Sequence, residues 1–492
     1  MLNLSRLSFA ILALSFACKA TFAQDNDKKP VPESATLGNQ KPQPRDPLLL
    51  PQHDQARTDA EQAYRNSDHK KVIELMSGVL AQNPKDHVAL YLRGSSRVDL
   101  GAGTGDAAVV RAGINDARES ITVKDKDNLN YYLPYLKGMT TLSIVEKKRT
   151  HADVAIDFAT KLLKQETLKG EEKSNALYQR ALAYSAVQNQ PKAIADLQEA
   201  VRITPNHLGA RVDLGGALAA VGQSTAAMNA YNDAVKAFPN LPLVYNNRGF
   251  FLQSVGRLDD AIIDFTKAME LDPQFIEAIS NRGFVSMNKG NYESAEADFT
   301  QSLSLNAAQP SVLSLRAGSK LSRGDIDAAI ADYNEVLKWD SKNSYGHAEL
   351  GFALFFAGKS QEALVELDKT AEIDPKLRFV LPWRYLAMLA LGQKAQADAK
   401  FAADLAIPKE KREWPDQLLV YLGDKQSEQE LRKAINKDPN ATDAQLCEAE
   451  FFIGQRKFVA GQKDAAKVHF AAALKSKATQ LSAYRGAKLA VK

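Results

Sequence analysis

The sequence predicts an all-α protein, a superhelical solenoid of antiparallel helix pairs with about 12 repeats and degenerate ends. A glycine recurs every 34 residues through the middle of the chain. Small residues keep fixed places on both sides of it, and prolines follow where a second helix would have to end. A fixed period of this size indicates stacked supersecondary units. The recurring glycines are Gly222, Gly256, Gly290, Gly324, Gly358 and Gly392.

Seven uninterrupted repeats fill residues 174–411 when this glycine is counted as the fifteenth residue of each, with Gln188 in its place in the first. The eighth residue is small in all but the last repeat, the twentieth is always alanine, and the twenty-fourth is always large and apolar. Two helices approach closely only where both carry small side chains, so we expect the eighth and twentieth residues to face each other. The repeats begin at Ser174, Leu208, Pro242, Ile276, Pro310, Ser344 and Arg378.

The third of these repeats shows the pattern best. It has Gly249 at the eighth position, Ala261 at the twentieth, Phe265 at the twenty-fourth and Pro273 at the thirty-second. In these residues the sequence resembles the tetratricopeptide-repeat (TPR) family. The resemblance covers residues 174–411 without a gap, and it implies that the first helix of each pair lines a concave groove where partner segments dock.

Weaker repeats flank this region and set the predicted domain boundaries. We interpret residues 53–173 as degenerate N-terminal repeats, and residues 412–492 as degenerate C-terminal repeats with a final helix that caps the open end of the stack. The glycine-rich stretch 101–105 lacks the preceding strand that a phosphate-binding loop needs, so it is predicted to be a long turn between two helices.

A second, narrower resemblance concerns the C-terminal region. The sequence motifs that carry it are Trp414-Pro-Asp-Gln-Leu-Leu-Val-Tyr-Leu-Gly423, Ser427-Glu-Gln-Glu-Leu431, Cys447-Glu-Ala-Glu-Phe-Phe-Ile-Gly454 and Gly461-Gln-Lys-Asp-Ala-Ala466. Through them residues 414–490 are similar to the C-terminal region of the NlpI-type TPR lipoproteins of the bacterial envelope. Members of that family are adaptors that bring murein endopeptidases and their degrading protease together. The resemblance therefore implies envelope scaffolding with murein hydrolases among the partners, although this chain has more repeats.

The N-terminus has the pattern of an export signal. Arg6 precedes an apolar run over residues 7–17, and a small residue, Ala23, marks the expected cleavage site, so residues 1–23 are predicted to be a signal peptide. The alternative is a lipoprotein anchored through Cys18, for which Phe16 is bulky where a small residue is expected. The proline-rich residues 24–52 are predicted to form a disordered linker. The protein is therefore expected in the periplasm or at the cell surface.

Composition and motifs argue against several other classes of protein. The formal net charge of +4 is too small for a nucleic-acid-binding footprint, and no later segment is long and apolar enough to span a bilayer. The histidines are scattered without a metal-binding or catalytic pattern, and the two cysteines lack the spacing of a zinc site. We therefore expect no metal, no cofactor and no enzymatic activity. The oligomeric state is left open.

Position seven of the repeat carries arginine in five of the seven repeats, where the TPR family normally has leucine. Four of these arginines share a repeat with an aspartate at position twenty-three, which favours an ion pair that braces the two helices. An arginine ladder for anionic ligands is the alternative. The expected pairs are Arg180 with Asp196, Arg248 with Asp264, Arg282 with Asp298, and Arg316 with Asp332.

Positions nine and twelve of the first helices share a face and form an apolar stripe, while position six adds two asparagines that could bind an extended backbone. This stripe is the predicted partner-binding groove, and packing between neighbouring first helices is the alternative interpretation. Its residues are Asn247, Phe250, Asn281, Phe284, Met287, Leu321, Phe352, Phe355 and Leu386.

The function predicted from these features is that of an exported TPR scaffold or adaptor. It would bind protein or peptide partners in the bacterial cell envelope, with peptidoglycan-hydrolase regulation as one role. A repeat component of an envelope secretion or polysaccharide-export machine is the first alternative. An enzyme-associated domain is the weakest, because no segment of suitable length is left unassigned.

Overall fold

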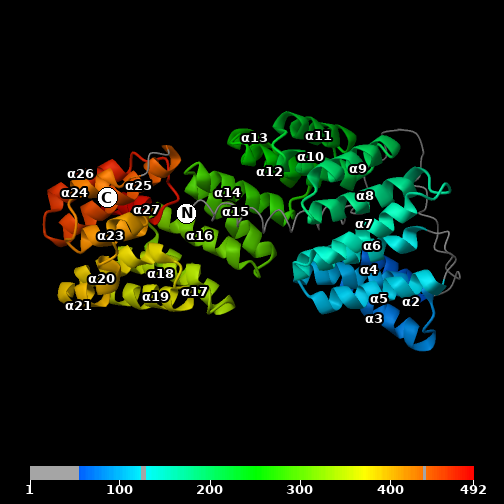
Figure 1. The fold of residues 1–492 in the computed structure, drawn as a ribbon, viewed down its shortest axis with the longest axis horizontal. Coiled ribbons are helices and arrows are strands. Elements are labelled where there is room, and N and C mark those ends of the chain that lie inside the picture. Colours follow the sequence, from blue (N-terminus) through cyan, green and yellow to red (C-terminus); the bar gives the residue numbers. More distant parts are fainter. Residues whose placement is uncertain (1–54, 124–128, 436–438, 492) are drawn as a thin grey trace. The chain divides into compact units, whose positions relative to one another are not determined.

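The computed structural model describes residues 55–123, 129–435 and 439–491. Within these ranges the chain forms 26 α-helices and no strand, which confirms the all-α prediction. The predicted signal peptide, the linker and Cys18 lie outside the described residues. The chain divides into two compact units, Met1–Val255 and Gly256–Lys492, and the division falls between the two helices of the repeat that begins at Pro242. Figure 1 labels the helices of both units.

Unit 1 consists of antiparallel helix pairs in which each helix packs against its neighbours in sequence. Its elements are α2 (Gln55–Arg65), α3 (His69–Gln82), α4 (His87–Thr104), α5 (Ala107–Val123), η1 (Leu129–Tyr132), α6 (Leu133–Glu146), α7 (Arg149–Leu162), α8 (Gly170–Ala186), α9 (Gln190–Ile203), α10 (Leu208–Ala220), α11 (Ser224–Ala237) and α12 (Pro242–Ser254).

Unit 2 continues the same arrangement and ends in shorter, less regular helices. Its first elements are α13 (Leu258–Leu271), α14 (Ile276–Asn288), α15 (Tyr292–Leu305), α16 (Pro310–Arg323), α17 (Ile326–Trp339), α18 (Ser344–Phe356), α19 (Ser360–Ile373), η2 (Arg378–Val380) and α20 (Leu381–Ala390). The rest are α21 (Lys394–Lys400), α22 (Ala402–Leu405), η3 (Lys409–Lys411), α23 (Trp414–Leu422), α24 (Glu428–Lys433), α25 (Pro439–Val459), α26 (Lys463–Ala473) and α27 (Ser482–Ala490).

The repeat register predicted from the sequence is the register of the structure. All seven alanines at the twentieth position have an exposed fraction of 0%. The six recurring glycines have φ between 73° and 104°, the left-handed conformation that turns the chain after a first helix. Gln188 takes the same conformation, with φ of 60°, in the one repeat that lacks the glycine. The turn is therefore set by the packing of the repeat, and glycine adopts it without strain.

Replacing Ala295 by leucine is expected to lower the free energy of unfolding by about 1 to 3 kcal/mol, because the larger side chain overpacks the contact between α14 and α15. At the facing position Gly283, a Cβ atom would already lie 2.9 Å from Cε1 of Phe299. Urea unfolding followed by circular dichroism measures the change. Ala297→Leu, at an exposed position of the same helix, is the matched control. Equal stability of the two variants would contradict the close helix contact.

The glycine-rich stretch 101–105 is not the long turn predicted from the sequence. Helix α4 continues through it to Thr104, and only Gly105, with φ of 71°, leaves the helical conformation. A Cβ atom on Gly101 would lie 2.6 Å from Cγ2 of Val110, so glycine lets α5 approach α4 at this point. Gly94 and Gly113 make a similar approach between the same two helices. These glycines therefore serve helix packing.

The C-terminal part of unit 2 departs from the regular repeat in two places. In the last regular repeat the second helix is broken at Phe401 into α21 and α22. The final helix α27 was predicted only to cap the end of the stack, but it makes further contacts. It contacts the last pair, α25 and α26, and also reaches α16 and α18, which lie far earlier in the sequence (Figure 1). Its small residues Ala483 and Ala487 belong to the same apolar core as α20, α23 and α25.

Candidate functional site

Three of the predicted ion pairs are formed with bidentate geometry. Nε and Nη2 of the arginine donate to the two carboxylate oxygens of the aspartate on the second helix of the same repeat, at 2.7 to 3.0 Å. The hydrogen bond to Asp298 raises the pKa of Arg282 above its ordinary value despite partial burial, and Asp196 does the same for Arg180. The pairs formed are Arg180–Asp196, Arg282–Asp298 and Arg316–Asp332.

The third nitrogen of each of these arginines reaches a threonine that precedes the repeat, a feature that sequence analysis missed. Nη1 of Arg282, on α14, donates to Oγ1 of Thr266 on α13 at 3.2 Å. Nη1 of Arg180 donates to Thr160 in the same way, at 3.1 Å. One guanidinium therefore joins three successive helices. The available signal was a threonine sixteen positions before Arg282 and Arg316, whereas Thr160 lies twenty positions before Arg180.

The two remaining arginines follow variations of this arrangement. Arg384 shares its repeat with Lys400, and both residues bind Asp368, which occupies the place that threonine has elsewhere. In this repeat the carboxylate lies on the preceding helix and position twenty-three carries the lysine, so the arginine still has an acidic partner. Nη1 of Arg248 donates to Oδ1 of Asn232 at 2.9 Å within unit 1. Asp264 belongs to unit 2, so its pairing with Arg248 stays a prediction.

A double-mutant cycle on Arg282 and Asp298 is expected to give a coupling energy of about 1 to 3 kcal/mol, because the two side chains share two charge-assisted hydrogen bonds in a half-buried setting. Arg282→Ala, Asp298→Ala and the double variant would be compared by chemical denaturation. The exposed pair Arg257–Asp260 serves as the control and should couple by less than about 0.5 kcal/mol. A coupling near zero for Arg282 and Asp298 would remove the bracing role.

Most residues of the predicted partner-binding groove pack inside their unit. Four side chains are buried: Asn281, Leu321, Phe352 and Leu386. Five are half-buried: Asn247, Phe250, Phe284, Met287 and Phe355. The ring centre of Phe352 lies 4.6 Å from that of Trp383, and Phe284 and Met287 pack against the core around Phe299. The stripe in unit 2 thus contributes largely to the packing of neighbouring first helices.

A segment of the chain itself packs on the first helices of unit 2, at residues that were not among the predicted groove residues. Arg485 of α27 is buried, and its Nη2 lies 3.0 Å from Oε2 of Glu349, which occupies position six on α18. Tyr333 donates a hydrogen bond of 3.1 Å to the same carboxylate. At position nine of α16, Gly318 replaces the large residue of its neighbours, and Arg485 passes over it. These contacts place α27 against the first helices α16 and α18.

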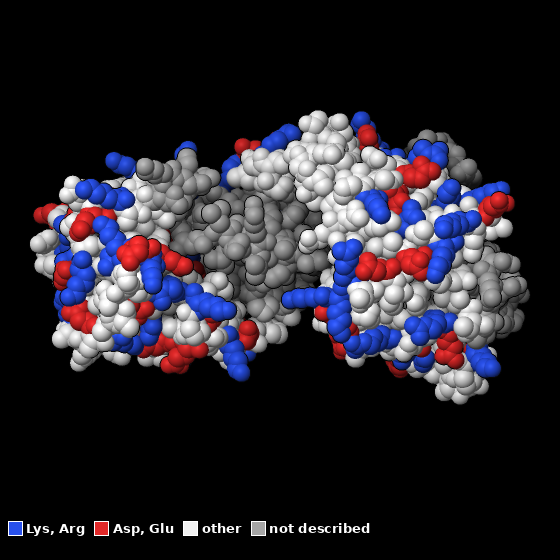
Figure 2. Space-filling view, viewed as in Figure 1, with Lys and Arg blue, Asp and Glu red and all other residues white. Residues whose placement is uncertain are grey.

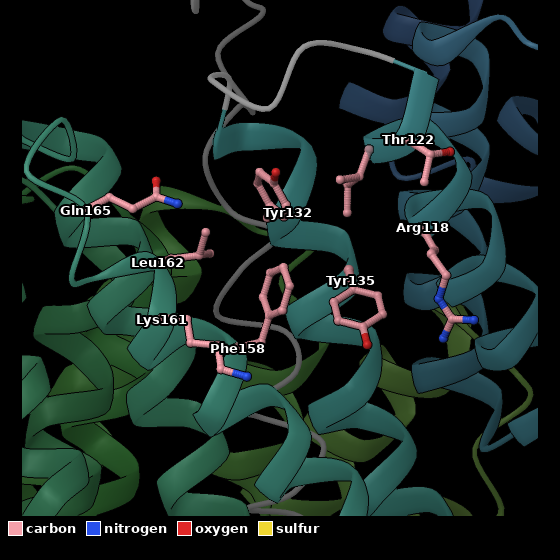
Figure 3. A pocket seen from close by; sticks show the side chains of 9 residues that line it. Arg118, Thr122, Tyr132, Tyr135, Phe158, Lys161, Leu162 and Gln165 are labelled. Atoms are coloured by element: carbon pink, nitrogen blue, oxygen red, sulfur yellow. The ribbon is translucent and has the colours of Figure 1, made fainter.

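Unit 1 has an open aromatic pocket of about 440 Å³ that sequence analysis did not find (Figure 3). The ring centre of Phe158 lies 5.4 Å from those of both Tyr132 and Tyr135. Arg118 and Lys161 stand at its rim, with the guanidinium of Arg118 5.8 Å from the centre of the Tyr135 ring. Such a pocket suits an apolar side chain next to an anionic group. The tyrosine-rich residues 131–135 were the available signal.

The residues that the structure describes include no group of histidine, cysteine, aspartate and glutamate that could hold a metal ion. Burial raises the pKa of Cys447 to about 12, so its thiol stays protonated and unreactive. None of the described helices has the length and hydropathy required to span a membrane.

On the face seen in Figure 2, basic and acidic side chains are interspersed over both units.

The chain carries tetratricopeptide repeats. The family model described as tetratricopeptide repeat matches residues 174–207, 243–275 and 276–309, in the register predicted above. No protein with a curated description matches the chain.

Several solved structures are similar to the chain. A tetratricopeptide-repeat protein from Parabacteroides merdae has 21% identity and a TM-score of 0.39, covering 51% of this chain and 98% of its own. Pseudomonas aeruginosa pilF has 22% identity and a TM-score of 0.37, with coverage of 41% and 92%. YrrB, described as a TPR protein with an unusual peptide-binding site, has 17% identity and a TM-score of 0.34, with coverage of 38% and 95%.

Proposed function

We propose that this protein is an exported scaffold that binds protein or peptide partners in the bacterial cell envelope. TPR proteins are protein-interaction scaffolds, and this chain carries such repeats. The observation that carries the proposal is the run of tetratricopeptide repeats in the predicted register, and the packing of helix α27 on the first helices α16 and α18 is consistent with first helices that hold a helical segment. The signal pattern at residues 1–23 and the NlpI-like phrases at residues 414–490 support the envelope location and murein hydrolases as partners.

Photo-crosslinking in cells that make the full-length protein tests the proposal. A crosslinking residue replaces Phe284, which is half-buried on α14 and belongs to the predicted groove, or Val468, which is 68% exposed on α26 and serves as the control. We expect adducts with an envelope protein from position 284 and none from position 468. Adducts of the same kind from both positions, or none from either, would argue against the predicted partner-binding groove.

The mature N-terminus tests the location separately. Mass spectrometry of the exported chain is expected to find Gln24 as its first residue, as the signal pattern predicts. A diacylglyceryl group on Cys18 would instead establish the anchored form. A full-length chain retained in the cytoplasm would contradict export.

A further inference from the structure

Two of the seven regular repeats share a glycine at position nine and a tyrosine at position twenty-four. They are the repeats with Gly216 and Tyr231 in unit 1, and with Gly318 and Tyr333 in unit 2. In the other five repeats both positions carry leucine or phenylalanine. A Cβ atom on Gly216 would lie 3.6 Å from the hydroxyl oxygen of Tyr231, and the corresponding distance in the other repeat is 3.7 Å. In both repeats the glycine therefore leaves space above a tyrosine hydroxyl group.

Helix packing does not require the glycine at position 216. The hydroxyl group of Tyr231 is the one contact within 4 Å that a Cβ atom there would make with another described helix, and 3.6 Å is an ordinary van der Waals distance. Glycine in the interior of a helix is less stable than alanine, and Gly216 lies inside α10 at an exposed position. Such a glycine is typical of a place where a ligand approaches the backbone closely.

In unit 2 an arginine side chain fills the equivalent space. A Cβ atom on Gly318 would lie 3.5 Å from Nη1 of Arg485, a buried residue of α27. Nη2 of Arg485 lies 3.0 Å from Oε2 of Glu349, and Tyr333 donates a hydrogen bond of 3.1 Å to the same oxygen. Because α27 belongs to the core of unit 2, the protein itself fills this site. The glycine and tyrosine thus accommodate a guanidinium group that has a carboxylate as its counter-ion.

The equivalent site in unit 1 is open and contains an unused polar group. Tyr231 is 7% exposed, and its hydroxyl group has no hydrogen-bond partner among the residues that the structure describes. This hydroxyl group faces the space that the exposed Gly216 leaves open. A nearly buried polar group without a partner costs free energy, so the hydroxyl oxygen is suited to accept a hydrogen bond from a ligand.

The carboxylate of Asp213 lies beside this space. Asp213 is three residues before Gly216 on α10, and residues three apart share one face of a helix. Tyr178 on α8 donates a hydrogen bond of 2.8 Å to its Oδ2, but no cation pairs with Asp213 in the described part of the chain. Burial raises the pKa of Asp213 to about 7, and burial together with the charge of Asp213 raises the pKa of Tyr231. The carboxylate is therefore close to the hydroxyl group of Tyr231 and lacks a counter-ion.

We propose that Gly216, Tyr231 and Asp213 form a binding site for an arginine side chain of a partner protein. The carboxylate neutralises the guanidinium group, as Glu349 does for Arg485 in unit 2, and the hydroxyl oxygen of Tyr231 accepts one of its hydrogen bonds. Arginine suits the site better than lysine, because its planar group with five donors reaches two acceptors at once. The proposal rests on the proposed scaffold function, since position nine belongs to the predicted groove, and it names the chemistry of the partner segment.

Binding of short peptides to the chain from Gln24 onward tests the proposal. The probes are two acetylated and amidated pentapeptides, Gly-Ser-Arg-Ser-Gly and the same sequence with citrulline, which has the shape of arginine without its charge. Ligand-detected NMR at about pH 8, above the pKa of Asp213, measures their dissociation constants. We expect the arginine peptide to bind at least about tenfold more tightly than the citrulline peptide.

Two variants locate the site. Asp213→Asn keeps an acceptor for the hydrogen bond from Tyr178 but has no charge, so it should weaken binding of the arginine peptide at least about tenfold. Gly216→Leu fills the opening with the residue type that the preceding repeat has at Leu182. It should abolish binding, while the melting temperature stays the same or rises because leucine favours the helix. Asp233→Asn, at an exposed position on α11, is the matched control and should leave binding unchanged.

Equal affinities of the two peptides would overturn the proposal, and so would undiminished binding to Asp213→Asn or Gly216→Leu. A lysine peptide that binds as tightly as the arginine peptide would contradict the preference for arginine. If Asp213→Asn fails to fold, Gly216→Leu still decides, because it adds an exposed side chain and removes no contact. The crosslinking experiment at Phe284 measures partner binding independently, so failure of the arginine site would leave the scaffold function standing.

Discussion

Replacing Trp383 by alanine is expected to lower the free energy of unfolding of unit 2 by about 3 to 5 kcal/mol. Trp383 lies on α20 and is 4% exposed. Its ring centre is 4.6 Å from that of Phe352 on α18, and 5.1 and 5.2 Å from those of Phe451 and Phe452 on α25. Because the indole fills the space where three helices meet, its removal leaves a cavity that these rings cannot close without moving the helices.

Trp339 on α17 provides the matched control, because it is the same residue type at 53% exposure. Trp339→Ala should change the stability by less than about 0.5 kcal/mol. Urea unfolding followed by far-ultraviolet circular dichroism compares the two variants without depending on tryptophan fluorescence. If both variants unfold at the same urea concentration, Trp383 does not hold the three helices together.

The repeat architecture could be predicted from the sequence because its causes are local. The seven buried alanines, the glycines in the left-handed conformation and the large residues at the twenty-fourth position each act within one helix pair, at a fixed spacing. The ion pairs were predictable for the same reason. The prediction stopped at the boundary of one repeat, and so it missed the link from Arg282 to Thr266 on the preceding helix.

The long turn at residues 101–105 was predicted wrongly, because a run of glycines is ambiguous without its neighbours. Gly101 continues α4 since Val110 packs against it from α5. Sequence analysis could not decide between a turn and a close helix contact. The same limit applies to the aromatic pocket of unit 1, which α5, η1, α6 and α7 form together.

The predicted groove shows a further limit of pattern analysis. An apolar stripe of first-helix residues has the same spacing whether it binds a partner or packs neighbouring helices. Phe352 has the second role, because Trp383 at position six of the next repeat covers it. The contact between Glu349 and Arg485 joins residues 136 positions apart in the sequence, and no repeat period relates them. Gly318, the one small residue in the stripe of position nine in unit 2, was its only local sign.

Unit 2 is expected to lose stability as the pH rises from acid to alkaline values, because of Glu448. This carboxyl group on α25 is buried, and Nε1 of Trp414 donates a hydrogen bond of 2.7 Å to its Oε2. Burial raises the pKa of Glu448 from the ordinary value of 4.5 to about 7. The folded protein therefore keeps a proton that the unfolded chain has already released in this interval. The stabilisation is complete below pH 4.5 and is lost as the pH rises through 7.

Glu448→Gln should remove this loss, since glutamine stays neutral and its carbonyl oxygen can still accept the indole hydrogen bond. The difference between the two pKa values corresponds to about 3 kcal/mol, so the variant should exceed the parent in stability by that amount at about pH 8. At about pH 4 the two proteins should be nearly equal, because both groups are then neutral. Denaturation by urea at both pH values measures the difference.

Glu450, two residues further along α25, provides a control of opposite sign. Burial alone would raise the pKa of Glu450, but hydrogen bonds from Arg432 and His469 hold it below the ordinary value. The stabilisation that the ionised Glu450 provides is present above the pKa that this group has in the unfolded chain. It is lost as the pH falls through the lower pKa of the folded protein, so Glu450→Gln should destabilise unit 2 most at about pH 8. The two variants should thus shift the stability in opposite directions at alkaline pH, although they change the same residue type at neighbouring positions. A Glu448→Gln variant less stable than the parent at alkaline pH would show that Glu448 is buried as a stabilised carboxylate.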